Sequence, residues 1–235
     1  MNDTNYTKFN DLEYDKYIAQ GRIERSNIEI NLNFVKKFDI KKDDKVLEIG
    51  CGIGTLTNRL YSEGFDILGI DISEKAIKFG KKVYGKSAPI KSLDFRKNNF
   101  KDNSFDVVLS FDVIEHIPNI KEHLTEVKRI LKPNGRYIFQ TPNILINPIW
   151  ETIQHRDLSW RNYHISLQSY WSLKSHFKSN NFTIIILKEN VSSTFLFLKV
   201  KKIFGGRLSN LIIKSINFLP LWFYPNFYAI AEVRK

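Results

Sequence analysis

The sequence predicts an α/β fold in which parallel strands alternate with helices. Short apolar runs rich in Val, Ile and Leu recur between residues 45 and 141, and amphipathic stretches of helical length separate them. A glycine-rich turn follows the first apolar run. Because consecutive parallel strands need a crossover connection, this alternation indicates βαβ units with helices on both faces of one sheet.

The elements follow from the apolar runs and from the residues that bound them. The expected strands are residues 45–49, 66–71, 89–94, 104–113 and 136–141. The expected helices between them are residues 54–64, 73–85 and 120–132. Gly64 closes the first helix and Ser73 is the predicted N-cap of the second. Leu124, Val127 and Leu131 share one face of the third.

Both flanks of this core differ from it. Apolar residues at loosely helical spacing over 15–38 predict one or two lead-in helices, within an N-terminal helical segment over residues 1–39. After Thr141 the connections lengthen, as they do where substrate sites are built. The expected order there is a loop-rich stretch over 142–165, a helix over 166–180, a strand over 182–190, an apolar and basic insertion over about 191–225, and a last strand over 227–235.

Composition limits the class of protein. A chain of 235 residues with 43% hydrophobic residues is long enough for one domain with an appendage. The net charge of +11 comes mostly from scattered lysines, which we interpret first as solubilising residues and second as attracting anions. A single cysteine excludes an internal disulfide. The polar N-terminus and the lack of a long apolar run predict a cytoplasmic protein.

The motif EIGCGIG at residues 48–54 indicates a nucleoside site. Its glycines follow the first strand, where backbone amides and a helix N-terminus face a ligand. Asp71 ends the second strand and is placed to accept hydrogen bonds from ribose hydroxyls. The spacing differs from the dinucleotide fingerprint G-x-G-x-x-G. Glu48 would repel a pyrophosphate, whereas the ammonium group of an amino acid would tolerate it.

With these residues the chain resembles the class I S-adenosylmethionine-dependent methyltransferases over roughly residues 40–190. The segments 103–117 and 126–143 are similar to later motifs of the branch that contains the ubiquinone-pathway O-methyltransferases. The resemblance implies a Rossmann-like, seven-stranded, mostly parallel sheet with an antiparallel last strand, and a domain over residues 40–235. It implies S-adenosyl-L-methionine as cofactor and S-adenosyl-L-homocysteine as product. The implied cofactor-binding residues are Glu48, Gly50, Cys51, Gly52, Gly54, Asp71, Ile72, Asp94, Phe95 and Phe111.

Methyl transfer also needs a group that takes a proton from the acceptor, and histidine titrates near neutral pH. The predicted catalytic residues are His116 and His164, with His155 behind them. In some relatives an E-x-x-E-H motif and a later histidine bind a divalent metal. Here Asp112, Glu115 and His116, together with His164, resemble that pattern, and a metal is the less favoured hypothesis. Cys51 we interpret as a small buried residue of the turn.

The acceptor is less constrained than the methyl donor. We expect a small molecule, methylated on an oxygen and quinone-like, lipid-linked or a saccharide. The apolar and basic insertion is compatible with core packing, a lid, a subunit interface or peripheral contact with the inner membrane surface. The alternatives are an RNA or protein methyltransferase and a non-catalytic scaffold that binds S-adenosylmethionine. Nucleic acid is the less favoured partner, and the sequence does not indicate an oligomeric state.

Overall fold

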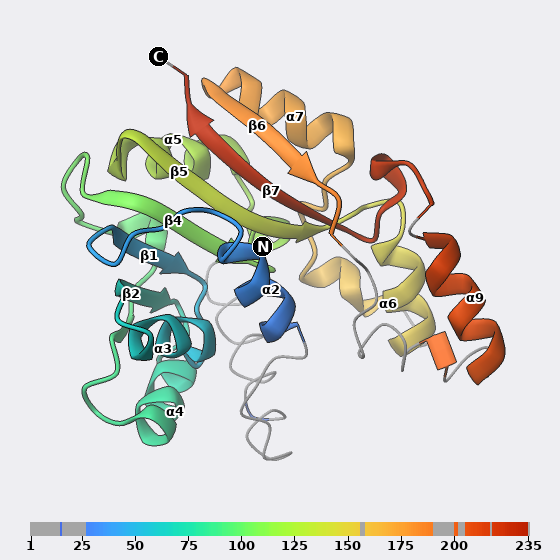
Figure 1. The fold of residues 1–235 in the computed structure, drawn as a ribbon, viewed down its shortest axis with the longest axis horizontal. Helices are drawn as coiled ribbons and strands as arrows, with labels where there is room; N and C mark the ends of the chain where they lie inside the picture. Colours follow the sequence, from blue (N-terminus) through green and yellow to red (C-terminus); the bar gives the residue numbers. More distant parts are fainter. Residues whose placement is uncertain are drawn as a thin grey trace.

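The computed structural model describes residue 15 and residues 27–155, 158–189, 200–201, 205–216 and 218–234. Seven strands form one sheet in the order β3-β2-β1-β4-β5-β7-β6 (Figure 1). The strands are β1 (Lys45–Ile49), β2 (Asp66–Asp71), β3 (Ile90–Ser92), β4 (Phe105–Phe111), β5 (Leu131–Pro142), β6 (Phe182–Leu187) and β7 (Asn226–Val233). Only β7 is antiparallel to its neighbours β5 and β6. The predicted fold class is thus confirmed.

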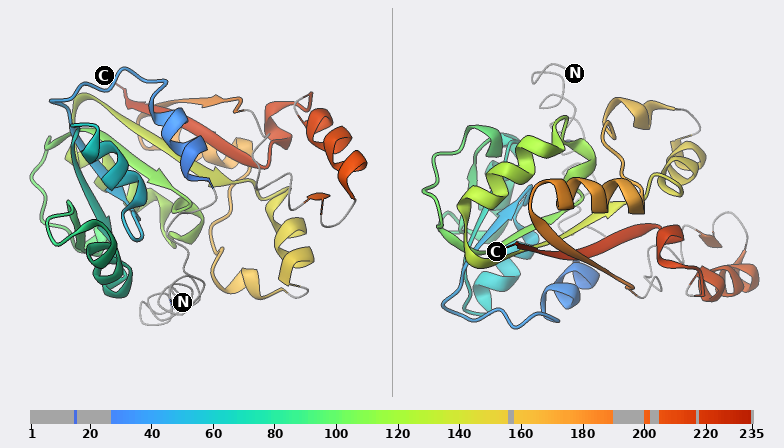
Figure 2. Two further views of the ribbon diagram at one scale, coloured as in Figure 1. Left: turned by 60° about the horizontal axis from the view of Figure 1, so that its bottom comes forward. Right: turned by 90° about the horizontal axis from the view of Figure 1, so that it is seen from above.

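Helices cover both faces of the sheet (Figure 2). The α-helices are α2 (Ile28–Val35), α3 (Thr55–Ser62), α4 (Glu74–Tyr84), α5 (Ile120–Ile130), α6 (Asn147–His155), α7 (Tyr170–Ser179) and α9 (Gly206–Ile216). The 3₁₀ turns are η1 (Phe95–Lys97), η2 (Ile114–His116), η3 (Ser159–Asn162) and η4 (Leu221–Phe223). Helices α2 and α3 share one apolar cluster with the sheet, and α5 and α7 share the cluster on the other face.

The strand order reverses between β1 and β4, and both carboxyl ends lie at one edge of the sheet. Ile49 of β1 pairs with Ser110 of β4, and Asp71 of β2 lies one residue beyond the Ile49–Ile70 pair. A switch of this kind leaves a crevice outside the strand ends, where open α/β sheets bind their ligands. The loops after β1, β2 and β4 therefore line the candidate ligand-binding site.

Two segments differ from the sequence-based expectation. The stretch over 142–165, expected to be loop-rich, contains α6 and η3, and the following helix begins at Tyr170 after the capping box of Ser169 and Ser172. The helix expected over 120–132 ends at Ile130, and Leu131, expected on its apolar face, is the first residue of β5. Within β5 the pairing jumps from Phe105–Leu131 to Val107–Arg136. The positive φ of Asn134 explains this irregularity.

Other predictions hold or lie outside the described residues. Ser73 caps α4 by accepting from Ala76 N–H at 3.1 Å. The lead-in segment contributes α2, which packs through Phe34 against Tyr228 of β7 with ring centroids 5.0 Å apart. The described part of the chain does not include residues 1–14 and 16–26 of that segment, or residues 190–199. In that described part, no helix has the length and hydropathy needed to cross a bilayer.

A buried histidine makes stability depend on pH. His123 of α5 is buried, its Nε2 lies 3.0 Å from the Tyr137 hydroxyl, and that hydroxyl lies 2.7 Å from Ser110 Oγ. Burial lowers the pKa of His123 from its usual 6.5 to about 4, against a smaller opposing effect of the Glu126 charge. Between these two values the unfolded chain binds a proton that the folded chain excludes, so stability is lost as the pH falls from 6.5 toward 4.

We expect a His123→Gln variant to lose this pH dependence, because glutamine can bond to Tyr137 and does not titrate. Relative to the variant, the wild type should lose roughly 2–3 kcal/mol of unfolding free energy as the pH falls from about 7 to about 4.5. Urea unfolding of both proteins at the two pH values measures it. A difference between the proteins that is the same at both pH values would contradict the assignment.

Candidate functional site

The loop after β1 brings its backbone close to its neighbours. Gly50, Gly52 and Gly54 have φ values of 71°, 60° and 84°, in the left-handed region that glycine adopts without strain. Gly54 is the N-cap of α3, so the loop leads directly into a helix N-terminus. A β-carbon on Gly50 would lie 2.4 Å from Val113 Cγ2. The loops after β1 and β4 are therefore in contact, and a side chain at Gly50 would force them apart.

Asp71 ties this loop to the end of β2. Its carboxylate accepts from Gly52 N–H at 2.8 Å through Oδ2 and from Ser73 N–H at 2.9 Å through Oδ1. The side chain is buried, so these charge-assisted bonds are made with little competition from water. Asp71 thus fixes the glycine loop and the start of α4 relative to each other.

Glu48 is also buried, and its carboxylate accepts a hydrogen bond from the Thr57 hydroxyl of α3. The structure therefore gives Glu48 a bond across the loop, and its contact with an amino group stays a prediction. Cys51 is buried beside Ile77 and Ile90, in agreement with its interpretation as a small buried residue. Gly69 faces Thr57 and Cys51 so closely that a β-carbon there would lie 2.4 Å from Thr57 Oγ1.

The remaining predicted cofactor residues lie near the same edge in different settings. Asp94 accepts from Arg96 at three nitrogen atoms, the backbone N at 3.0 Å, Nε at 3.0 Å and Nη2 at 2.7 Å. Phe95 is buried, with its ring edge-on to His123. Ile72 is half-buried after β2, and Phe111 is buried at the end of β4. Arg96 was missed by the sequence analysis, although an arginine two residues after an acid is a recognisable pairing signal.

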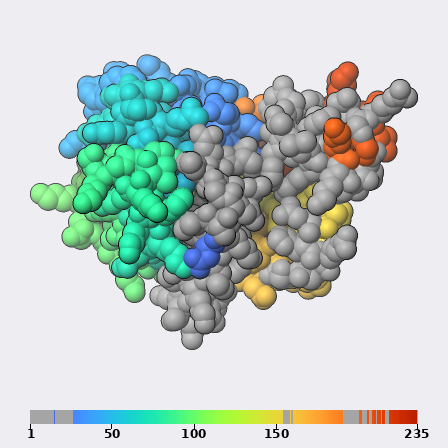
Figure 3. Space-filling model, turned by 90° about the horizontal axis from the view of Figure 1, so that it is seen from below, coloured from blue at the N-terminus to red at the C-terminus, as the bar shows by residue number. Residues whose placement is uncertain are grey.

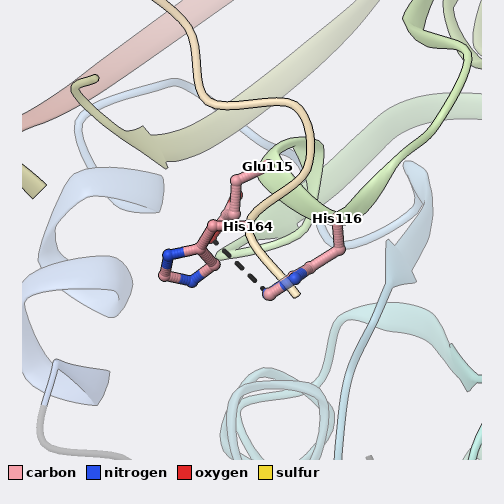
Figure 4. A group of neighbouring side chains, drawn as sticks. All are labelled: Glu115, His116 and His164. Carbon is pink, nitrogen blue, oxygen red and sulfur yellow. Dashed lines mark ion pairs between the residues drawn. The ribbon is translucent and has the colours of Figure 1, made fainter. Parts of the chain in front are cut away.

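Glu115 and His116 of η2 lie close to His164, which follows η3 (Figure 4). One ligand atom from each of Glu115, His116 and His164 lies within 4.8 Å of the others. Glu115 Oε1 is 3.9 Å from His116 Nε2, and the two imidazole rings have centroids 5.1 Å apart. The structure thus brings together both predicted catalytic histidines, which lie 48 positions apart in the chain.

Each member of this cluster is held by a neighbour. The Thr141 hydroxyl of β5 donates to Glu115 Oε2 at 3.0 Å. His116 Nδ1 lies 2.7 Å from the Tyr163 carbonyl oxygen, and His164 Nδ1 lies 3.0 Å from Asn147 Oδ1. Carbonyl oxygens only accept, so in both histidines Nδ1 carries a proton, and in the neutral imidazole Nε2 then carries the lone pair. This tautomer is the one that a base or a metal ligand requires at Nε2.

Asp112 does not join this cluster, which corrects the predicted metal ligand set. Asp112 adopts a left-handed φ of 56° directly after β4, and its N–H donates to the Gln140 side-chain oxygen at 3.1 Å. Burial raises the pKa of Tyr228 on β7, and the negative charge of Asp112 adds to this shift. Of the residues that the structure describes, those placed closely enough to share a metal ion are Glu115, His116 and His164, and this group does not include Asp112. The side chain of His155 lies outside the described residues.

Comparison with known proteins agrees with this arrangement. Residues 47–139 match the model of the methyltransferase domain family. An uncharacterized protein of Methanocaldococcus jannaschii is 33% identical over 199 residues, which are 80% of this chain and 84% of that protein. Phosphoethanolamine N-methyltransferase 1 of Arabidopsis thaliana is 32% identical over 143 residues, 59% of this chain and 29% of the plant enzyme.

A ubiquinone biosynthesis O-methyltransferase of Pelagibacter ubique is 33% identical over 124 residues, 48% of this chain and 51% of that enzyme. The chain thus spans under a third of the plant enzyme and about half of the bacterial one. Among solved structures, phosphoethanolamine N-methyltransferase 2 of Haemonchus contortus, in complex with phosphomonomethylethanolamine and S-adenosylhomocysteine, superposes with a TM-score of 0.64. It is 22% identical, and the match covers 88% of this chain and 52% of that one.

Proposed function

The chain belongs to the class I S-adenosylmethionine-dependent methyltransferases, and we propose that it transfers the cofactor's methyl group to an oxygen of a small-molecule acceptor. The observation that carries the proposal is the juxtaposition of two groups at one edge of the sheet. Asp71 and the glycine loop would hold the cofactor, and the cluster of Glu115, His116 and His164 would receive the acceptor.

The cofactor half of the proposal rests on the carboxylate of Asp71. The ribose hydroxyls would donate to Asp71, whose oxygens are already aligned by Gly52 and Ser73. The amino-acid tail would lie along Gly50–Gly54, where three glycines in the left-handed region lead into the N-terminus of α3. Because Val113 packs against Gly50, the sulfonium end of the cofactor would lie beside the loop that carries Glu115.

The acceptor half rests on the tautomers of the two histidines. In an in-line displacement the acceptor oxygen forms a bond to the methyl carbon, the carbon–sulfur bond breaks, and its electron pair stays on sulfur. The acceptor proton would go to Nε2 of His116, next to the buried carboxylate of Glu115. A hydroxyl is a poor nucleophile until it loses its proton, whereas a neutral amine is nucleophilic without a base. We therefore propose an oxygen acceptor that is quinone-like, lipid-linked or a saccharide.

A divalent metal is a second role for the same three side chains. One carboxylate oxygen and two imidazole nitrogens within 4.8 Å fit the ligand preferences of Zn²⁺ or Mn²⁺. The Nδ1 protons of the histidines are held by Tyr163 and Asn147, as is usual for metal-ligating histidines. Bound there, the ion would act as a Lewis acid on an acceptor oxygen.

Isothermal titration with S-adenosylmethionine and S-adenosylhomocysteine tests the cofactor half of the proposal. We expect saturable binding of both at one site per chain, with an affinity far better than millimolar. Absence of binding by either compound at near-millimolar concentration would overturn the proposal. Binding without methyl transfer to any candidate metabolite in an extract supplied with labelled cofactor would instead support a non-catalytic scaffold.

A further inference from the structure

Exposed apolar side chains gather at one end of the molecule. Among the described residues thirteen large apolar side chains are exposed, and eleven of them lie in residues 144–171 and 208–223, outside the strands. These eleven are Ile144, Leu145, Ile149, Ile153, Leu158, Ile165, Trp171, Leu208, Leu211, Phe218 and Phe223. The other two are Tyr61 and Ile185. Single exposed apolar residues are ordinary, but a cluster of this size is typical of a surface that binds a protein, a membrane or a ligand.

The elements that carry these side chains lie at the same end of the molecule in every view. Helices α6 and α9 project beyond the strand ends, on the far side from α3 and α4 (Figures 1 and 2). Seen from below, residues of α9 (orange-red) and α6 (yellow) reach the surface at that end (Figure 3). Phe218, just after α9, is 87% exposed, and Leu211 on α9 is 63% exposed. We call α6, α9, Phe218, η4 and Trp171 the apolar end.

Aromatic rings stand at the apolar end in mutual contact. Trp171 and Trp222 have ring centroids 5.7 Å apart, and Trp222 and Phe223 have centroids 4.3 Å apart. Trp171 nevertheless remains 58% exposed. Tryptophan has an apolar body with one polar N–H, and it prefers the boundary between lipid chains and headgroups.

The charges around α9 and η4 have one sign, whereas α6 carries Glu151. Residues 191–231 contain no aspartate or glutamate and five basic residues, Lys199, Lys201, Lys202, Arg207 and Lys214. Lys214 on α9 is exposed beside Ser215, and Lys174 and Lys188 are exposed on neighbouring elements. Positive charge interleaved with exposed Leu and Phe suits an anionic surface with an apolar interior.

We propose that the apolar end binds the surface of an anionic lipid bilayer, with Leu208, Leu211 and Phe218 inserted among the acyl chains and lysines at the headgroups. Helix α9, with 11 residues, is too short to span a bilayer, so it would lie in the interface. A second copy of the chain fits the surface less well. A two-fold contact brings the same patch together from both copies, and here it would bring the same lysines together.

This orientation would place the acceptor site next to the bilayer. Asn147, the first residue of α6, accepts the bond from His164, so the apolar end and the histidine cluster share a helix. A lipid-linked acceptor would then reach the cluster without leaving the membrane surface. Lipid binding itself needs neither cofactor nor turnover, so this proposal and the proposed function can fail separately.

Vesicle flotation of the full chain without cofactor tests the proposal, with phosphatidylcholine vesicles that contain or lack phosphatidylglycerol. We expect binding to the anionic vesicles at low salt and weaker binding at high salt. Leu211→Ser and Phe218→Ser should each weaken it by about tenfold. Lys214→Glu should weaken binding to anionic vesicles alone. Tyr61→Ser and Lys82→Glu, which change exposed residues of α3 and α4, are the matched controls and should bind like the wild type.

Three outcomes would overturn the proposal. One is a protein that stays unbound with anionic vesicles at low salt. Another is an equal loss of binding in Tyr61→Ser and Phe218→Ser. The third is a dimer in sedimentation velocity that Phe218→Ser dissociates while vesicles are not bound, which would make the apolar end an interface between two copies. Circular dichroism of every variant checks that loss of binding is not loss of folding.

Discussion

Glu115→Gln should reduce turnover by roughly 10²- to 10⁴-fold, the range in which general acid–base groups contribute, while cofactor affinity stays unchanged. Glu115 is 1% exposed, and its Oε1 lies 3.9 Å from His116 Nε2. Glutamine keeps the shape and still accepts from Thr141, so the variant removes the charge without opening a cavity. Transfer of a labelled methyl group gives turnover, and titration with S-adenosylhomocysteine gives the affinity.

The matched control is Glu122→Gln, the same substitution at an exposed position in the first turn of α5. It should leave both turnover and cofactor affinity unchanged. Wild-type turnover in Glu115→Gln would contradict a role for the cluster in the chemistry. A loss of cofactor affinity equal to the loss of turnover would place Glu115 in the cofactor site instead.

The same enzyme assay distinguishes a cluster that acts as a general base from one that binds a metal ion. If Glu115 acts through His116 as a base, a chelator should leave wild-type turnover unchanged. If the cluster holds a metal, the chelator should abolish turnover and added Mn²⁺ or Zn²⁺ should restore it in the wild type. In that case Glu115→Gln should not be restored, because the amide is a weaker ligand than the carboxylate.

A segment of this fold can be predicted from the sequence when its burial in the core imposes a clear pattern of apolar residues. Residues 45–49 and 66–71 were predicted to the residue, because β1 and β2 are apolar runs bounded by charged and glycine residues. Helix α6 was missed, since its apolar side chains, Ile149 and Ile153, stay exposed and give no core-facing pattern. The spacing of apolar residues indicates which side of a helix packs against the core, so a helix that does not pack there is hard to predict.

The site shows a similar division. Residue types and motif spacing pointed to Asp71, Glu115, His116 and His164 as candidates, because carboxylates and imidazoles are the groups that such chemistry uses, and the structure gathers the last three in one cluster. Their supporting partners were not predicted. The Tyr163 carbonyl belongs to the backbone, which has no residue-type signal. Asp112 was misassigned because its side-chain direction depends on a left-handed φ, which aspartate adopts but which no sequence pattern here indicates.

Asp71→Asn should weaken binding of S-adenosylhomocysteine by about 100-fold, or about 3 kcal/mol. Both carboxylate oxygens accept from backbone N–H groups, Oδ1 from Ser73 and Oδ2 from Gly52. Asparagine has one carbonyl oxygen, so its NH₂ group would face one of these N–H donors. The variant would thus lose both the charge that ribose hydroxyls would bond and the bond that positions the glycine loop.

Asp66→Asn is the control for this prediction, since it makes the same substitution at the exposed first residue of the same strand. Isothermal titration of the three proteins should give equal affinities for the wild type and Asp66→Asn. An Asp71→Asn variant that binds as tightly as they do would remove Asp71 from the cofactor site. Because the glycine loop is anchored through Asp71, the nucleoside would then have to bind away from the β1–β2 edge, and the assigned site would be wrong as a whole.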